Sequence, residues 1–295
     1  MKRVLITGAN SYIGVSFEQY AKKHYPQQLQ IETIDMQRKE WREADFGIYD
    51  AIFHVAGIAH ADIEHVTEET KALYYQVNTD LAIETAKKAK AEGVAQFVFM
   101  SSMIIYGGKK YIDKDTEPSP ANFYGDSKWQ ADKGIRELES DTFQVAVIRP
   151  PMIYGKGSKG NYRAMEKMAK KLPVFPKCSN KRSMLYIDNL CELLCQIFIQ
   201  KEQGIFFPQN PQLVNTSHMV KLIANSYHHK IWVTGLLQPF VALGKHMPGK
   251  IGKMCCKAFG SSYYDLQMSN YPWKYQVVTL EQSIQEMSKQ ESKNE

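Results

Sequence analysis

Short apolar runs and longer amphipathic stretches alternate along the first half of the chain. Four runs, at 4–6, 30–34, 51–55 and 96–100, have the length of buried strands. A helical pattern follows the first run at Phe17, Tyr20 and Ala21, and a further helix is expected over 74–91, before Gly93. Because strands that alternate with helices form parallel sheets covered on both faces, we expect an α/β fold with a ligand at the carboxyl ends of its strands.

A glycine-containing turn joins the first run to the first helical stretch. A strand, a tight turn and a helix N-terminus present free backbone N–H groups and a positive dipole end to a pyrophosphate. The turn therefore predicts a doubly wound parallel Rossmann sheet and a dinucleotide cofactor, although an ordinary strand-to-helix connection is the alternative. Ser11 stands where a middle glycine is usual, and its side chain should crowd the phosphates unless its hydroxyl takes part. The predicted cofactor contacts here are Gly8, Asn10, Ser11, Tyr12, Ile13 and Gly14.

An acidic residue at the end of the second run completes this pattern. Asp35 lies at the spacing of about twenty residues after the turn at which such sites bind the adenosine ribose. Its carboxylate would repel a 2′-phosphate, which favours NAD. Arg38 leaves NADP open, because a nearby guanidinium is what an NADP site uses.

The segments 44–46 and 56–60 predict further contacts at the same edge of the sheet. The segment 44–46 lies where an adenine ring would be held. The segment 56–60 follows a buried run, and its small residues would let the backbone approach the nicotinamide half of a cofactor. The predicted contacts are Asp45 and Phe46 for the adenine, Ala56, Gly57 and Asn78 for the rest of the cofactor, and His60 for the substrate.

Tyr124 and Lys128 are the residues that most directly indicate chemistry. They stand four apart, ahead of a helix expected over 130–138, and four residues is about one helical turn, so they share a face. The Lys128 ammonium should lower the pKa of the Tyr124 phenol from about 10 toward the working range. Such a tyrosine can exchange a proton with a substrate hydroxyl during a nicotinamide-dependent oxidation. Ser102, at the end of the fourth run, can hydrogen-bond the same oxygen.

Four motifs in this order resemble the extended short-chain dehydrogenase/reductases of the NAD-dependent epimerase/dehydratase family. They are the opening turn, 101–107, Tyr124-x-x-x-Lys128 and 149–155, joined by 159–161 and 182–189. The resemblance covers residues 1 to about 225 and is greatest to the branch of UDP-glucose 4-epimerases and nucleotide 4-keto-sugar reductases. It implies that Ser102, Tyr124 and Lys128 are catalytic and that Lys128 also holds the nicotinamide ribose.

The same resemblance implies further contacts and a partner. Pro151 falls at the cofactor, and Asn161 and Arg182 fall where relatives contact the nucleotide diphosphate of the sugar. A guanidinium suits a diphosphate because it can donate two parallel hydrogen bonds. The alternative for Arg182 is a surface arginine in the basic run 177–182. A homodimer through two helices of the cofactor domain is usual among relatives.

Two departures from the family pattern narrow the expected reaction. Met103 and Ile104 stand where 4,6-dehydratases carry an acidic pair, so dehydration is not expected. Met152 replaces an asparagine of typical 4-epimerases, which favours a 4-keto-sugar reductase. We therefore carry three hypotheses: an enzyme acting at C4 of a nucleotide-diphosphate sugar in the manner of an epimerase, a 4-keto-sugar reductase, and a non-catalytic NAD(P)-binding protein.

Composition and charge exclude other classes. The 295 residues are 44% apolar with a net charge of +6, and no Lys/Arg block interleaved with aromatic residues points to nucleic acid before residue 230. The five cysteines suggest reduced thiols, and no His or Cys pairs recur at metal-ligand spacing, so we expect no metal. A first strand at Arg3 leaves no room for a signal peptide, and the longest apolar stretch, 231–244, is too short to span a bilayer. We expect a cytoplasmic protein.

The domain division follows from where the alternation breaks. We expect a cofactor domain over 1–150 plus about 184–208, and a smaller substrate lobe over 151–183 and 209–295. In that lobe Thr216 or Ser217 is the expected N-cap of a helix, and the last dozen residues are expected to fray. The segment 231–264 combines apolar and aromatic residues with lysines, and is either a basic surface resting on a membrane or, as we prefer, a packed part of the lobe.

Overall fold

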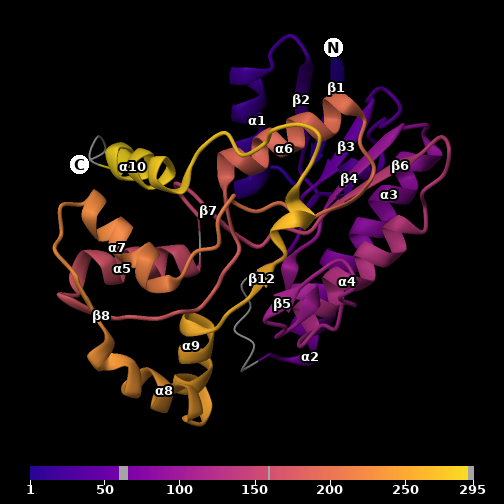
Figure 1. Ribbon diagram of the computed structural model, residues 1–295. Helices are drawn as coiled ribbons and strands as arrows, with labels where there is room; N and C mark the ends of the chain where they lie inside the picture. The colour runs from indigo at the N-terminus through magenta and orange to yellow at the C-terminus, as the bar shows by residue number, and fades with distance from the viewer. Residues whose placement is uncertain (60–65, 159, 292–295) are drawn as a thin grey trace.

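A six-stranded parallel sheet, with helices on both of its faces, forms the larger of two parts of the molecule (Figure 1). The computed structural model describes residues 1–59, 66–158 and 160–291. The strand order is β10-β6-β4-β3-β1-β2, so the order reverses at β1, where a doubly wound sheet opens its ligand crevice. The predicted fold class is confirmed. The strands are β1 (Lys2–Thr7), β2 (Leu29–Ile34), β3 (Ala51–His54), β4 (Gln96–Met100), β6 (Gln144–Ile148) and β10 (Gly204–Phe206).

Each face of the sheet has its own apolar core, because alternate residues of a strand point to opposite sides. On one face Val4, Ile6 and Phe53 pack with the first helix and with the helix that precedes β10. On the other face Leu5 and Ile52 pack with alanines of two further helices. The helices of the first face are α1 (Tyr12–His24) and α6 (Ile187–Gln200), and those of the second are α3 (Leu81–Ala91) and α4 (Phe123–Arg136). Helix α2 (Glu68–Tyr75) packs on α4.

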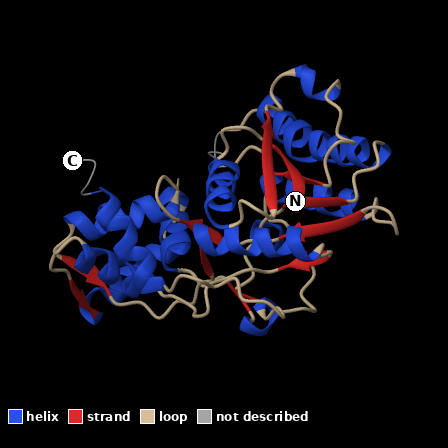
Figure 2. Cartoon of the chain, turned by 90° about the horizontal axis from the view of Figure 1, so that it is seen from above, coloured by secondary structure: helices blue, strands red, loops and turns tan. Residues whose placement is uncertain are grey.

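A second group of elements lies beyond the carboxyl edge of the sheet, on the side of the C-terminus (Figure 2). Three of its helices, α5 (Asn161–Lys171), α7 (Thr216–Ser226) and α10 (Leu280–Glu291), pack together, whereas α8 (Gln238–His246) and α9 (Gly249–Phe259) pack on each other. Three parallel strand pairs lie outside the large sheet: β7 (Met152–Tyr154) with β9 (Met184–Tyr186), β8 (Val174–Pro176) with β11 (Trp232–Thr234), and β5 (Tyr111–Ile112) with β12 (Tyr263–Tyr264). The pair of β5 and β12 joins the N-terminal part of the chain to its C-terminal part. We infer that α6 and β10 belong with the large sheet, since β10 pairs with β6 and α6 packs on α1, and the division into a cofactor domain and a substrate lobe stays a prediction.

Several predicted boundaries were wrong. The helix expected over 74–91 is α2 and α3 joined by a π-helical turn, Gln76–Asp80. Helix α4 begins at Phe123 rather than at 130, because Asn122 caps it by accepting a hydrogen bond from Gly125 N at 2.8 Å. As a result Tyr124 and Lys128 both lie inside the helix.

Two expectations for the C-terminal part were also wrong. Neither Thr216 nor Ser217 caps α7; Asn215 does, since its Oδ1 accepts from His218 N at 2.7 Å. The last dozen residues do not simply fray, because those up to 291 belong to α10, where Ile284 and Met287 are buried against α7 and the core.

Candidate active site

A cavity of about 520 Å³ opens at the carboxyl edge of the sheet, and we call it the site cavity. Its lining comes from the turns after β1, β3, β4 and β6, from α4, and from the second lobe. It therefore lies at the switch point that the strand order predicts. The lining residues are Asn10, Ser11, Tyr12, Ile13, Val55, Gly57, Ile58, Ala59, Met100, Ser101, Ser102, Tyr124, Lys128, Pro150, Pro151, Met152, Ile153, Ser158, Gly160, Asn161 and Lys257.

The turn between β1 and α1 is shaped by Gly8 and Asn10. Gly8 has a φ of +130°, and a Cβ there would lie 2.7 Å from the backbone nitrogen of Ala56, so no other residue fits without a shift. Asn10 has a φ of 63°, which asparagine adopts more readily than most residues. The Ser11 hydroxyl caps α1 by accepting a hydrogen bond from Gly14 N at 3.1 Å. The side chain expected to crowd a phosphate is instead turned to the helix end.

Lys128 is buried at the floor of the site cavity. Its Nζ donates to the carbonyl of Met100 at 3.1 Å, and burial lowers the pKa of the Lys128 ammonium to about 8. A Cβ on Gly57 would lie 3.1 Å from this Nζ, so glycine leaves the ammonium room. The lysine is thereby anchored to the end of β4.

Tyr124 lies one turn earlier on α4, half-buried, with its ring edge against Tyr74 at 5.9 Å between centroids. Burial, assisted by Tyr74, raises the pKa of the Tyr124 phenol to about 12. The expected lowering of this pKa by Lys128 was wrong for the protein alone, because burial removes water from around the phenolate and so raises the pKa.

The two serines at the end of β4 have different surroundings. Ser102 is half-buried in the cavity wall, and its Oγ accepts from Ile104 N at 3.2 Å. Ser101 is buried, and its Oγ donates to the Asp132 carboxylate at 2.8 Å. Both serines line the site cavity together with Tyr124 and Lys128, and Ser101 is the one whose hydroxyl is bound to the Asp132 carboxylate.

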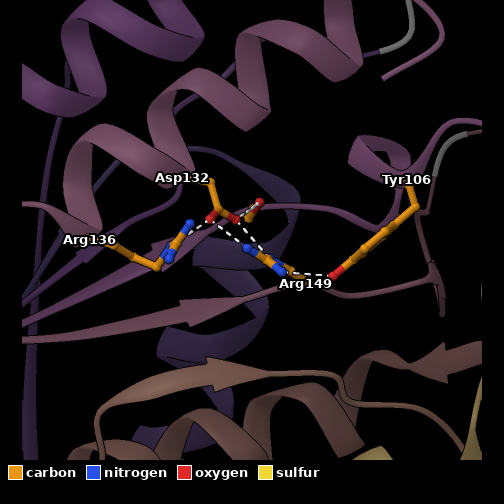
Figure 3. Close-up of polar contacts among 5 residues, drawn as sticks. Tyr106, Asp132, Arg136 and Arg149 are labelled. Atoms are coloured by element: carbon orange, nitrogen blue, oxygen red, sulfur yellow. Dashed lines mark hydrogen bonds and ion pairs between the residues drawn. The ribbon is translucent and has the colours of Figure 1, made fainter. Parts of the chain in front are cut away.

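A buried ionic network lies behind this wall (Figure 3). Arg149 donates to both oxygens of Asp132, from Nε at 2.9 Å and from Nη2 at 2.7 Å, and its Nη1 donates to the Tyr106 hydroxyl at 2.7 Å. Arg136 reaches the same carboxylate at 3.0 Å. Because Asp132 is on α4 and Arg149 follows β6, the network ties the helix of Tyr124 to the strand that leads to Pro150 and Pro151. The sequence reasoning missed it, although an Asp four residues after Lys128 was visible.

Other predicted contacts have structural partners. Asn78 is fully buried, and its amide exchanges hydrogen bonds with the backbone of Ile58 at 2.8 and 3.1 Å, so it holds a cavity-lining loop. Phe46 is fully buried in the core beneath α3, so the expected contact of its side chain with an adenine ring was wrong. Asp45 is exposed and accepts from Gly47 N at 2.8 Å.

The two charged residues that should discriminate NAD from NADP face each other. Asp35 follows β2 and accepts from Gln37 N at 2.9 Å, and Arg38 Nε lies 3.8 Å from its carboxylate. Both side chains are more than a third exposed, so either is available to a ligand.

The expected substrate contacts are only partly brought to the site cavity. Asn161 lines it, whereas His60 lies outside the described residues. Arg182 is not among the described lining residues; its Nη1 donates to the Lys257 carbonyl at 2.8 Å. Lys257 itself lines the cavity and was missed, because only the folded chain brings α9 to the sheet edge.

Two further lining residues have buried side-chain oxygens without a hydrogen-bond partner among the described residues. They are Tyr12, with its hydroxyl, and Ser158, with its Oγ. Buried polar atoms without a partner are rare in proteins, and here both border a cavity that can hold a ligand.

The sequence profile of the NAD dependent epimerase/dehydratase family matches residues 4–206. The chain belongs to this family. A UDP-glucose 4-epimerase of Vibrio cholerae is 27% identical over 256 residues, with 78% of this chain and 77% of the relative covered. The N-acetyl-alpha-D-glucosaminyl-diphospho-ditrans,octacis-undecaprenol 4-epimerase of Escherichia coli O157:H7 is 26% identical over 282 residues, with 88% and 82% covered.

Solved structures of family enzymes share the fold over nearly their whole length. A dTDP-4-dehydrorhamnose reductase from Bacillus anthracis, in complex with NADP, has a TM-score of 0.72 at 18% identity, with 98% of this chain and 99% of that chain covered. A UDP-glucuronic acid 4-epimerase variant from Bacillus cereus, in complex with NAD, has a TM-score of 0.73 at 13% identity, with 99% and 100% covered. A reductase and an epimerase resemble this fold equally, so the fold does not distinguish the two reactions.

Proposed function

We propose that this protein is a nicotinamide-dependent enzyme that acts at C4 of a sugar carried on a diphosphate. The observation that carries the proposal is the convergence of Ser102, Tyr124 and Lys128 on one cavity beside the N-terminal turn of α1. Each residue alone occurs in many folds. Together at the switch point of a doubly wound sheet they form an acid/base, a hydrogen-bonding partner and a cation around one space.

The residues around the cavity fit a dinucleotide. The turn at Asn10 and Ser11 lies at the N-terminus of a 13-residue helix, where a pyrophosphate is stabilised by backbone N–H groups and the helix dipole. The buried oxygens of Tyr12 and Ser158 provide unused hydrogen-bonding capacity. Lys128 would hold the ribose next to the reacting ring, and Asp35 the adenosine ribose of NAD, with NADP open through Arg38.

Tyr124 would move the proton of the C4 hydroxyl. When bound, a nicotinamide supplies the redox capacity for oxidising or reducing that carbon. The phenol would accept the hydroxyl proton in the oxidative direction and return it in the reductive one, while Ser102 hydrogen-bonds the same substrate oxygen. Lys128 supplies positive charge near the phenol, which favours its ionised form. Asn161, and Lys257 from the second lobe, would contact the diphosphate-linked part of the substrate.

An epimerase is the first candidate, and two relatives matched over three-quarters or more of this chain are named as 4-epimerases. One of these names describes a sugar diphosphate on undecaprenol, so we include lipid-linked as well as nucleotide-linked sugars in the substrate class. A 4-keto-sugar reductase is the second candidate. The observation favouring it is that Met152, which replaces the asparagine of typical 4-epimerases, lines the site cavity.

The first test is to denature freshly purified protein and identify any released nucleotide. Bound NAD indicates a cofactor recycled within each turnover, as an epimerase requires. A protein that is empty but oxidises NADH or NADPH with a 4-keto sugar nucleotide is a reductase. Absence of both activities, together with absence of cofactor binding, would refute the proposal.

The second test is Tyr124→Phe, with Tyr111→Phe as a matched control on an exposed tyrosine. Loss of the acid/base should lower turnover by about 10²–10⁴-fold while cofactor binding remains. The control should keep its turnover. Near-normal turnover in Tyr124→Phe would contradict the assigned role.

A further inference from the structure

Helix α8 and the residues that flank it present a row of apolar side chains to solvent. Phe240 and Leu243 lie on α8, one helical turn apart. Leu236 lies in the 3-10 turn before the helix, and Met247 directly follows its end. The exposed fractions of Leu236, Phe240, Leu243 and Met247 are 75, 70, 66 and 42%. Single exposed apolar residues are ordinary, but a contiguous row marks an interaction surface. The preferred interpretation of 231–264 as packed lobe therefore fails for its outer face.

The chain around this row carries positive charge alone. From Gln203 to Tyr264 the sequence has no Asp or Glu but six lysines. Lys253 and Lys257 are exposed on α9, which packs on α8, and Met254 between them is 67% exposed. An apolar row beside lysines matches the boundary of an anionic membrane, where acyl chains meet phosphate groups.

The two helices are fixed to the body of the protein at the start of α8 and at the end of α9. The Ala258 carbonyl accepts from Thr216 Oγ1 at 2.7 Å, and the Gly260 carbonyl accepts from Asn180 Nδ2 at 3.0 Å. Lys245 of α8 donates to the Phe259 carbonyl at 3.2 Å. Gln238, at the start of α8, donates to the Lys177 carbonyl at 3.3 Å, and the pair of helices lies away from the sheet (Figure 1). The surface is therefore held in a set position while its apolar row stays uncovered.

We propose that α8 and α9 form a docking surface for an anionic lipid bilayer. Leu236, Phe240 and Leu243 enter the boundary between headgroups and acyl chains, and Lys253 of α9 faces the lipid phosphates. Described helices of this chain are all too short or too polar to cross a membrane, so the contact is peripheral. Charge complementarity favours lipid over a second copy of this chain, because a second copy would bring the same lysines to the contact.

Docking also positions the site cavity. Lys257 belongs to α9 and lines that cavity, so the docked surface and the cavity share a helix. A sugar diphosphate carried on a lipid would then be presented beside its binding site. This last step rests on the proposed function, whereas the docking itself does not.

The experiment is sedimentation of the full chain with vesicles of phosphatidylcholine, with or without phosphatidylglycerol. The wild type should bind the anionic vesicles, and less at high salt. The triple variant Leu236→Ser, Phe240→Ser, Leu243→Ser should partition at least about tenfold more weakly, since each side chain contributes buried apolar area. Lys253→Glu should weaken binding to anionic vesicles in particular.

The matched control is Ile48→Ser, Leu73→Ser, Val277→Ser, three substitutions at exposed apolar positions elsewhere. It should bind like the wild type, and circular dichroism should show that both triple variants are folded. Equal binding by the α8 variant, or no binding by the wild type, would overturn the proposal. So would a wild-type dimer that the α8 variant converts to monomer, which would assign the surface to a second copy. Because no substrate is present, these results are independent of the proposed reaction.

Discussion

Replacing Asp132 by asparagine tests how the buried network supports the fold. Asp132 is fully buried, and Arg149 is 4% exposed. Asp132→Asn keeps the size of the side chain but removes the charge that balances the guanidinium. Breaking a buried ion pair from one side costs about 3–5 kcal/mol, because the remaining charge stays buried without its counter-ion.

The surroundings of Arg149 place the expected decrease in the free energy of unfolding toward the lower end of that range. The guanidinium carbon lies 5.7, 5.6 and 5.7 Å from the ring centroids of Tyr106, Trp129 and Phe207. These rings, with the Tyr106 hydroxyl, continue to stabilise the cation after the carboxylate is lost. We therefore expect a decrease of about 3 kcal/mol in the free energy of unfolding. Against a typical total of about 5–15 kcal/mol this is a large fraction.

Urea denaturation followed by circular dichroism measures this change. Arg136→Gln is the control, since Arg136 contacts the same carboxylate at 3.0 Å but is more than a third exposed, and it should cost less than about 1 kcal/mol. The double variant Asp132→Asn, Arg149→Met should recover part of the loss, because it removes the unbalanced charge. A change below about 1 kcal/mol in Asp132→Asn, or an equal change in Arg136→Gln, would refute the reasoning.

Three further predictions follow from local geometry. Gly107→Ala should lower the free energy of unfolding by more than about 1 kcal/mol, because Gly107 has a φ of +63° and a Cβ there would clash with the Ser119 carbonyl oxygen. Gly108→Ala is the control, since a Cβ at Gly108 would meet no atom within 4 Å. Equal melting temperatures of the two variants would contradict the prediction. Asn215→Ala should cost about 1 kcal/mol in thermal or urea unfolding by removing the cap of α7, and an unchanged midpoint would show that the cap is dispensable. The free energy of unfolding of the cofactor-free wild type, relative to that of Lys128→Met, should rise by roughly 3 kcal/mol between pH 8 and 10.5. The reason is that burial lowers the pKa of Lys128 to about 8 from its ordinary 10.5, so the unfolded chain binds more protons in that window. Urea unfolding of both proteins measures this, and parallel curves of unfolding free energy against pH would show that Lys128 is hydrated.

The parallel sheet could be predicted because its signals are local. Each buried strand is a short apolar run. The glycine turn at Gly8 is followed by Asp35 at the spacing that dinucleotide-binding folds show. The α4 boundary was missed because its start depends on one capping side chain, Asn122, which the apolar pattern does not mark. Helix α10 was missed because a polar composition concealed Leu280, Ile284 and Met287, which recur at helical spacing and are buried.

The candidate site could be predicted by residue type but not by environment. Tyr124 and Lys128 were found because their spacing is a property of one helix. Lys257 could not be found that way, because its place at the cavity depends on the path of the second lobe. Burial likewise depends on the whole fold, and it reversed the expected direction of the Tyr124 pKa.

That reversal has a physical consequence for how the site would operate. In the protein alone, burial disfavours the charged forms of both partners, since it raises the pKa of the Tyr124 phenol to about 12 and lowers that of the Lys128 ammonium to about 8. A phenol with so high a pKa is a weak base near neutral pH. Additional positive charge within the cavity would favour the phenolate, and a ligand that brings it would therefore be coupled to proton transfer. On this reasoning Tyr124 gains its proposed role from the residues and the cofactor together, rather than from the four-residue spacing to Lys128 by itself.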